Sequence, residues 1–207
     1  MKKNDNTEEL ILQAAEELFL QKGYSATSTT DIARRIGCNQ SLIHYYFRTK
    51  DALFERILIG KMSYILHHIS APLESDSPFE EKLRNIVSQY FDFLAANRNL
   101  PLFLLNEIIS NEKNRRFIVE REISNPHISR FFLQFDRCVK QEIEAGRIRS
   151  IETIDLMLNI ISLVVMSFVS LPFYCDICGN PDAADTYLAS RRNEICTLIL
   201  NGVKSAE

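Results

Sequence analysis

The sequence has no tryptophan and few residues that interrupt helices. Glycine and proline occur only six times each in 207 residues, and runs that alternate between apolar and polar residues are rare. Because a strand-rich protein of this size needs many turns, these shortages argue against a β-fold and favour a nearly all-α chain. With 46% hydrophobic and 25% charged residues, the composition is that of an ordinary globular protein with enough apolar mass for a core.

Cysteine is also scarce, at five residues. The number is odd, and residues 1–6 are polar and lack the apolar stretch of a secretory signal, so we expect a reducing, cytoplasmic setting. Cys175 and Cys178 have the spacing of half a zinc or redox motif, but no second pair follows them. We therefore expect no metal site and no cofactor, and keep a thiol- or metal-responsive protein that uses these two residues as an alternative.

Several signatures of catalysis are missing. The chain contains no glycine-rich phosphate loop, no nucleophile elbow and no His-Glu-x-x-His motif. We therefore expect that the protein is not an enzyme.

Positive charge is concentrated near the N-terminus, although the formal net charge of the chain is −3. Between residues 21 and 50 the only acidic residue is Asp31, against the cations Lys22, Arg34, Arg35, Arg48 and Lys50. This local excess suits contact with phosphates. A solvated helix face would account for the same charges.

Two short helical patterns follow one another in this basic segment. Ser28 and Asp31 resemble a capping box that opens a helix ended by Gly37, and Asn39 is placed to cap a second helix over about residues 40–46. Two short helices joined by a glycine turn predict a helix-turn-helix, which places its second helix in the DNA major groove. That second helix would expose Gln40, Ser41, His44 and Tyr45.

The same segment contains a set of short motifs, which are Gly23-Tyr24, Thr27-Ser28, Ile32-Ala33, Ile36-Gly37-Cys38 and the run from His44 to Leu53. With these motifs the chain resembles the tetracycline-repressor (TetR/AcrR-type) family of transcription regulators over about residues 8–55. The resemblance implies a helix-turn-helix DNA-binding domain over residues 7–55 and a helical regulatory domain over 56–207. It also implies a ligand-responsive regulator, expected to be a repressor released from a palindromic operator by a small apolar or aromatic effector.

The resemblance also implies roles for individual residues. Base contacts are expected near Gln40, Ser41 and His44, and contacts to the DNA backbone at Thr29, Thr30, Tyr45 and Lys50. Three residues depart from the usual pattern: Asn39, which keeps its capping role, Gln40 and His44. These positions face the groove, so we expect the operator preference of this chain to differ there from that of its relatives.

The rest of the chain predicts further helices, at about 78–96, 101–110, 113–124, 127–145, 151–173 and 181–202. Residues 156–174 are apolar nearly all round, which predicts burial on several sides. The family resemblance implies a homodimer built from the last two helices. A membrane span is the rival interpretation of the same stretch, but four polar residues and a late proline argue against it.

An aromatic-rich region lies between these parts. The resemblance implies a ligand pocket there, and the candidates for it are Phe103, Asn106, Glu107, His127, Phe131 and Phe135. An aromatic stripe at helical spacing is also what an ordinary core requires. A helical adaptor that binds a protein partner is therefore a further alternative.

Overall fold

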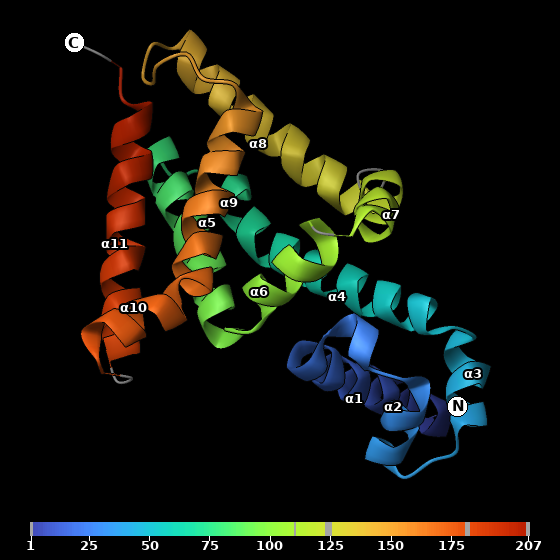
Figure 1. Cartoon of the computed structure of the whole chain (residues 1–207). Helices are drawn as coiled ribbons and strands as arrows, with labels where there is room; N and C mark the ends of the chain where they lie inside the picture. The colour runs from blue at the N-terminus through green and yellow to red at the C-terminus, as the bar shows by residue number, and fades with distance from the viewer. Residues whose placement is uncertain (1, 110, 123–125, 181–182, 206–207) are drawn as a thin grey trace. The chain divides into compact units, whose positions relative to one another are not determined.

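The structure is a computed structural model that describes residues 2–109, 111–122, 126–180 and 183–205. These residues are helical along most of their length and include no β-strand, which confirms the all-α prediction (Figure 1). In chain order the elements are α1 (Lys2–Ala26), α2 (Thr29–Ile36), α3 (Gln40–Phe47), α4 (Lys50–Ser70), η1 (Ala71–Glu74), α5 (Phe79–Ala96), α6 (Leu100–Leu104), η2 (Leu105–Ile109), α7 (Glu112–Glu122), α8 (Pro126–Glu144), α9 (Thr153–Val169), α10 (Leu171–Cys178) and α11 (Ala183–Val203).

The chain divides into two compact units. The first unit comprises residues 1–63 and 103–116, and the second comprises 64–102 and 117–207. The first unit therefore combines the N-terminal helices with a segment that the sequence places in the following regulatory region.

The core of the first unit is built from one apolar face of each helix. Ile11, Ile32, Ile43 and Leu53 are fully or almost fully buried, one each on α1 to α4. An aromatic cluster surrounds Phe54, whose ring lies 5.6 Å from that of Phe19, 4.7 Å from Tyr24 and 5.7 Å from Phe103 between centroids. Burial of these side chains holds the two short helices against α1 and α4.

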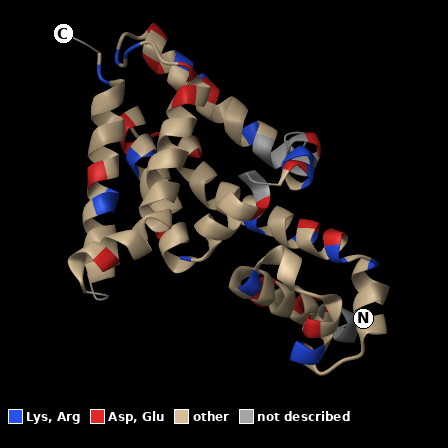
Figure 2. Ribbon diagram, viewed as in Figure 1, with Lys and Arg blue, Asp and Glu red and all other residues tan. Residues whose placement is uncertain are grey.

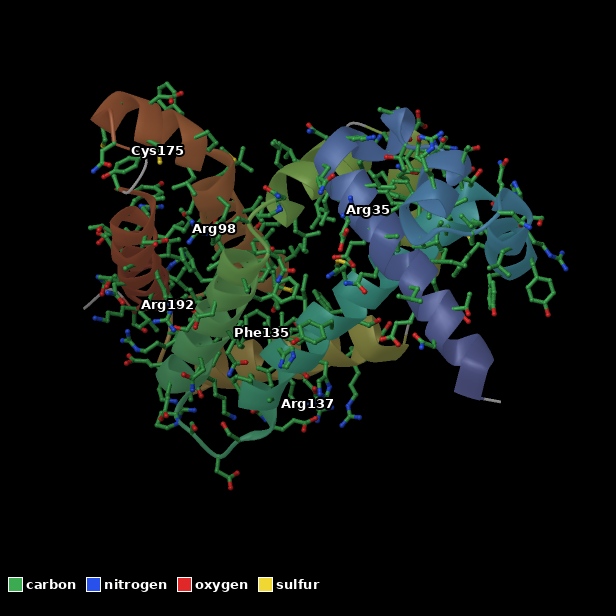
Figure 3. The ribbon with its side chains drawn as sticks, turned by 90° about the horizontal axis from the view of Figure 1, so that it is seen from below. Arg35, Arg98, Phe135, Arg137, Cys175 and Arg192 are labelled. Carbon is green, nitrogen blue, oxygen red and sulfur yellow. The ribbon has the colours of Figure 1, made fainter. Side chains whose placement is uncertain are left out.

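In the second unit α5, α9 and α11 pack against one another. The rings of Phe91 on α5 and Phe168 on α9 lie 4.9 Å apart. At the surface of this bundle, Arg192 of α11 forms a bidentate ion pair with Asp92 of α5, both contacts at 2.8 Å (Figure 3). Bidentate geometry is the stronger form of a surface ion pair, so it supports the packing that the apolar core establishes.

The predicted single helix over 151–173 is wrong. It is two helices, α9 and α10, bent by 47° at the break between them. The reason is Pro172, which lies in the first turn of α10 and cannot continue α9 because it has no N–H and its ring clashes with the preceding turn. The end of α9 is closed by Ser170, whose amide donates to the carbonyl of Met166 at 3.0 Å.

The segment predicted as one helix over 101–110 consists of two elements, α6 and the π-helical turn η2.

None of the helices in the described residues could span a membrane by itself. Helices α9 and α10 together have the length and apolar composition of a span, but they are bent against each other.

Candidate nucleic-acid interface

Helices α2 and α3 begin and end on local signals. Ser28 Oγ accepts from the Asp31 amide at 3.1 Å, while the Asp31 carboxylate accepts from the Ser28 amide at 3.1 Å. This capping box was predicted and is confirmed, and the hydrogen bonds from Ser28 hold the pKa of Asp31 below its usual value. Gly37 ends α2 with φ 70°, a left-handed conformation that glycine adopts without a Cβ penalty.

Asn39 opens α3 as predicted. Its Oδ1 accepts from the Leu42 amide at 3.1 Å. One of the unpaired amides of the helix start is thereby satisfied. Arg48 closes the helix with φ 52°, a conformation that a non-glycine residue rarely adopts.

Helix α3 has one buried and one exposed face. Ile43 and Phe47 are buried, whereas Gln40, Ser41, His44 and Tyr45 are exposed, Tyr45 by 74%. The helix carries no Lys, Arg, Asp or Glu, so its ribbon is tan along its length in Figure 2. The exposed face is thus uncharged and rich in hydrogen-bonding groups, which can contact base edges as well as phosphate oxygens.

Three of the predicted site residues are hydrogen-bonded to one another. Gln40 Nε2 donates to Thr29 Oγ1 at 2.8 Å and lies 3.3 Å from His44 Nε2. On its other side the His44 ring places Nδ1 3.0 Å from the carbonyl oxygen of Arg48. The start of α2 and the exposed face of α3 therefore share one polar network. Thr30, also predicted to contact DNA, is exposed on the same helix as Thr29.

The ammonium of Lys50 is half-buried against the backbone. It donates to the carbonyl oxygens of Tyr24 and Thr27, each at 2.9 Å, and lies 4.1 Å from the centroid of the Tyr24 ring. Sequence reasoning assigned Lys50 to a phosphate. It missed these acceptors because they are backbone groups more than 20 residues away.

A second network surrounds Tyr24. The Tyr24 hydroxyl and the ammonium of Lys113 both donate to the carboxylate of Asp51. The backbone amide of Tyr24 donates to Glu107 Oε1 at 2.9 Å. Burial, followed by the hydrogen bond to Asp51, raises the pKa of Tyr24 well above its usual value. The hydrogen bonds from Lys113 and then Tyr24 hold the pKa of Asp51 below its usual value. The network joins α1, α4, η2 and α7 within the first unit.

Two of the five cations in the basic segment are ion-paired. Arg34 contacts Asp31 at 3.1 Å, and Arg35 contacts Glu17 of α1 at 2.6 Å. Since Glu17 lies outside residues 21–50, the local excess of positive charge around α2 is smaller than the sequence of that segment indicates.

The six candidate pocket residues fall in both units. In the first unit, Phe103 is buried against Phe54, Glu107 binds the Tyr24 amide and Asn106 is exposed. In the second unit, Phe131 and Phe135 of α8 are buried with their rings stacked 6.0 Å apart (Figure 3). The side chain of His127 lies outside the described residues.

A cavity of about 420 Å³ lies elsewhere in the second unit, between the start of α5, the end of α8 and the end of α11. Charged side chains on its wall include Lys82, Glu142, Arg147 and Lys204. The described lining contains none of the six candidates, so this cavity was not predicted from the sequence.

Large apolar side chains are exposed on the last three helices. Leu158 of α9 is 54% exposed, Phe173 of α10 is 70% exposed and Leu198 of α11 is 45% exposed. The others are Ile154, Ile161, Met166 and Ile177. We call these seven residues the apolar face. A concentration of this kind on a folded protein is typical of an interaction surface.

Cys175 is half-buried and Cys178 is exposed on α10, both as free thiols (Figure 3). Among the described residues no group of three or more His, Cys, Asp or Glu side chains could hold a metal ion.

Comparison with known proteins identifies both the N-terminal helices and most of the helical region that follows. Residues 11–57 match the family model described as bacterial regulatory proteins of the tetR family, and residues 80–199 match the model for the tetracyclin repressor-like C-terminal domain. The chain belongs to the tetracycline-repressor family. The expected ligand-responsive, DNA-binding transcriptional regulator is thereby confirmed at the level of the family.

Individual members of the tetracycline-repressor family are similar to the chain over part of its length. The fatty acid metabolism regulator protein of Bacillus subtilis is 23% identical over 139 residues, which is 67% of this chain and 69% of that protein. The QacR regulator of Staphylococcus aureus is 40% identical over 53 residues, covering 26% of this chain and 28% of QacR.

Solved structures share the fold over nearly the full length. FadR of Bacillus subtilis in complex with stearoyl-CoA has a TM-score of 0.73 at 20% identity, covering 94% of this chain and 98% of that one. A transcriptional regulator of Saccharomonospora viridis in complex with choline has a TM-score of 0.71 at 18% identity, covering 98% and 100%.

Proposed function

We propose that this chain is a cytoplasmic repressor that places α3 in the major groove of a palindromic operator. Gln40, Ser41 and His44 face the bases, because they are exposed on an uncharged helix surface. Thr29, Thr30 and Tyr45 face the DNA backbone, and Asn39 holds the start of the helix. The observation that carries the proposal is the capped, half-buried α3 with its polar outer face.

Lys50 acts in this proposal through the fold as well as through charge. Its ammonium bonds the carbonyls of Tyr24, near the end of α1, and Thr27, between α1 and α2, so it fixes the segment that presents Thr29. A residue in this position affects binding to every DNA sequence alike.

The protein acts as a homodimer in this proposal. The apolar face of α9, α10 and α11 supports it, since seven large apolar side chains on neighbouring helices are costly to leave in water. A two-fold dimer presents two copies of α3 to half-sites about 34–36 Å apart, which is one turn of DNA.

The proposed effector is a small molecule with a long apolar or aromatic part. The stacked and buried Phe131 and Phe135 support this class, because their rings would give apolar walls to a pocket that adjoins them. The stearoyl-CoA complex of the Bacillus subtilis relative gives a first compound to test. Binding of the effector favours an arrangement unsuited to the operator, which releases the DNA.

Footprinting on the DNA upstream of the gene tests the proposal. We expect protection of a palindrome, with binding that weakens steeply as salt is added. Stearoyl-CoA and choline are then titrated against the complex, and release by stearoyl-CoA alone supports the effector class. A protein that protects no DNA and captures a protein partner instead is a helical adaptor, and that outcome rejects the repressor.

A further inference from the structure

We infer that His44 is a positioning residue that sets the base preference of the chain by fixing which end of the Gln40 amide is offered to DNA. The inference rests on the proposed insertion of α3 into the major groove. Its basis is the row of contacts from Thr29 through Gln40 and His44 to the carbonyl of Arg48, at 2.8, 3.3 and 3.0 Å.

The positions of the protons follow from the chemistry of these groups. The carbonyl oxygen of Arg48 can only accept, so His44 Nδ1 carries the hydrogen of the neutral ring. Nε2 of the same ring is then an acceptor, and the Gln40 atom facing it must be a donor, the amide nitrogen. The second hydrogen of that nitrogen is given to Thr29 Oγ1.

Both amide hydrogens of Gln40 are therefore used within the protein. The outward end of the side chain is Oε1, for which no hydrogen bond is described. This arrangement withholds the bidentate contact that glutamine makes to adenine, since that contact needs an amide hydrogen as well as the oxygen. A lone acceptor selects bases that present an amino group in the major groove, which are adenine through N6 and cytosine through N4.

Protonation of His44 reverses the arrangement. Both ring nitrogens are then donors, so the Gln40 amide nitrogen would face a second donor across 3.3 Å. Turning the amide over places Oε1 against the imidazolium and lets the Thr29 hydroxyl donate to the same oxygen. The amide hydrogens then point outward and select acceptors. Guanine and thymine are favoured, because they present the oxygens O6 and O4 where adenine and cytosine present an amino group, although adenine also has an acceptor at N7.

The charged side chains near this row of contacts either pair with other residues or follow the end of α3. On α2, Asp31 binds Ser28 and Arg34, and Arg35 is paired with Glu17. On α3 itself the other ionisable side chains are Tyr45 and Tyr46, and Arg48 follows at its end. In the described parts of the chain no charged side chain bonds to the His44 ring. The polar groups that contact the His44 ring are thus the amide of Gln40 and the carbonyl of Arg48.

The test is selection of bound sequences from a library of random duplex DNA, at about pH 8 and at about pH 5.5, values that bracket the titration of histidine. The full-length wild-type protein is compared with His44→Ala. His68→Ala is the matched control, since His68 is an exposed histidine of α4 in the second unit. A Gln40→Ala selection identifies the base pair that Gln40 faces, because preference there disappears.

On one strand of that base pair we expect the wild type and His68→Ala to favour adenine or cytosine at the higher pH. At the lower pH the ratio of adenine plus cytosine to guanine plus thymine on the same strand should fall by about five-fold, the value of one hydrogen bond. His44→Ala should give the same ratio at both pH values. Gln40→Glu has only oxygens at its outward end, so it should favour adenine or cytosine throughout.

An unchanged wild-type ratio between the two pH values would overturn the inference, as would a change that persists in His44→Ala or appears in Gln40→Glu. If no pool is enriched in any sequence, the proposed operator binding fails instead. These two failures are distinguishable, because a wrong role for His44 still leaves an enriched palindrome.

Discussion

At the scale of the residue, Lys50 ties the start of α4 to the turn before α2. We expect Lys50→Met to lower the free energy of unfolding by about 1–2 kcal/mol, because two carbonyls lose a charged donor while the methionine keeps most of the apolar stem. Operator affinity should fall for all sequences alike. Urea denaturation and binding at several salt concentrations measure the two effects.

The salt dependence separates the two roles available to Lys50. If its ammonium only holds the fold, the slope of log affinity against log salt stays at the wild-type value. A slope reduced by about 0.9 with unchanged stability would show a lost phosphate contact instead. Lys22→Met is the control for removal of a nearby exposed cation.

Asp51 gives a prediction about acid stability. Because its folded pKa lies below the ordinary 3.8, the ionised carboxylate stabilises the fold fully above that value and loses its effect as the pH falls below it. Asp51→Asn should therefore melt at a lower temperature than the wild type at neutral pH. The difference should shrink as the pH falls below about 4, the ordinary range of aspartate.

The control for this measurement is Asp76→Asn, at an exposed position before α5. It should melt with the wild type at every pH. A deficit of Asp51→Asn that stays constant down to the lowest pH would show that the carboxylate acts through something other than its charge.

At the scale of the element, Asn39 holds the first turn of α3. Asn39→Ala should cost about 1 kcal/mol in unfolding free energy, the usual value of a lost cap. Asn39→Ser keeps an oxygen for the Leu42 amide and should restore the stability. Operator affinity measured for both variants then tells capping from base contact. If the serine variant is stable but binds a different sequence, Asn39 itself contacts a base.

The elements predicted well are those with signals in their own sequence. The ends of α2 and α3 were predicted to within a few residues, because each end signal acts on neighbouring backbone groups. These signals are the capping box of Ser28 and Asp31, the turn at Gly37 and the cap at Asn39. The break at Pro172 had a local cause too, but the apolar run around it dominated the helical pattern. The π-helical turn η2 could not be predicted, since η2 has no local signal and its Glu107 binds an amide 83 residues away.

At the scale of the whole molecule, the apolar face accounts for the proposed dimer. Leu158→Glu places a charge on α9 in that face, so we expect a monomer at concentrations where the wild type is dimeric. Affinity for a full palindrome should fall about 100-fold, because the two half-sites are no longer bound together. Sedimentation equilibrium and binding to full and half sites measure both.

Leu133→Glu is the matched control for this substitution. Leu133 is 62% exposed on α8 and lies outside the apolar face. It should leave both the dimer and the palindrome affinity intact. A Leu158→Glu protein that remains dimeric would place the interface elsewhere.

The long-range part of the candidate site lay beyond sequence reasoning. The row from Thr29 to Arg48 joins two helices, and the network of Tyr24, Asp51 and Lys113 joins residues up to 89 positions apart. Polar pairings of this kind depend on the tertiary fold rather than on spacing. The resemblance named the exposed residues of α3, but it could not show that Gln40 and His44 are bonded to each other.

The inclusion of residues 103–116 in the first unit limits how the chain can be cut and recombined. A fragment ending at residue 63 removes Phe103 from Phe54 and Glu107 from the Tyr24 amide, and so exposes a side of the DNA-binding unit. A chimaera that transfers operator preference to another regulator must therefore carry two separate stretches of sequence. If two family members exchange only their N-terminal segments, the residues at positions 103–116 come from a different protein than the helices they pack against, and the two surfaces do not match.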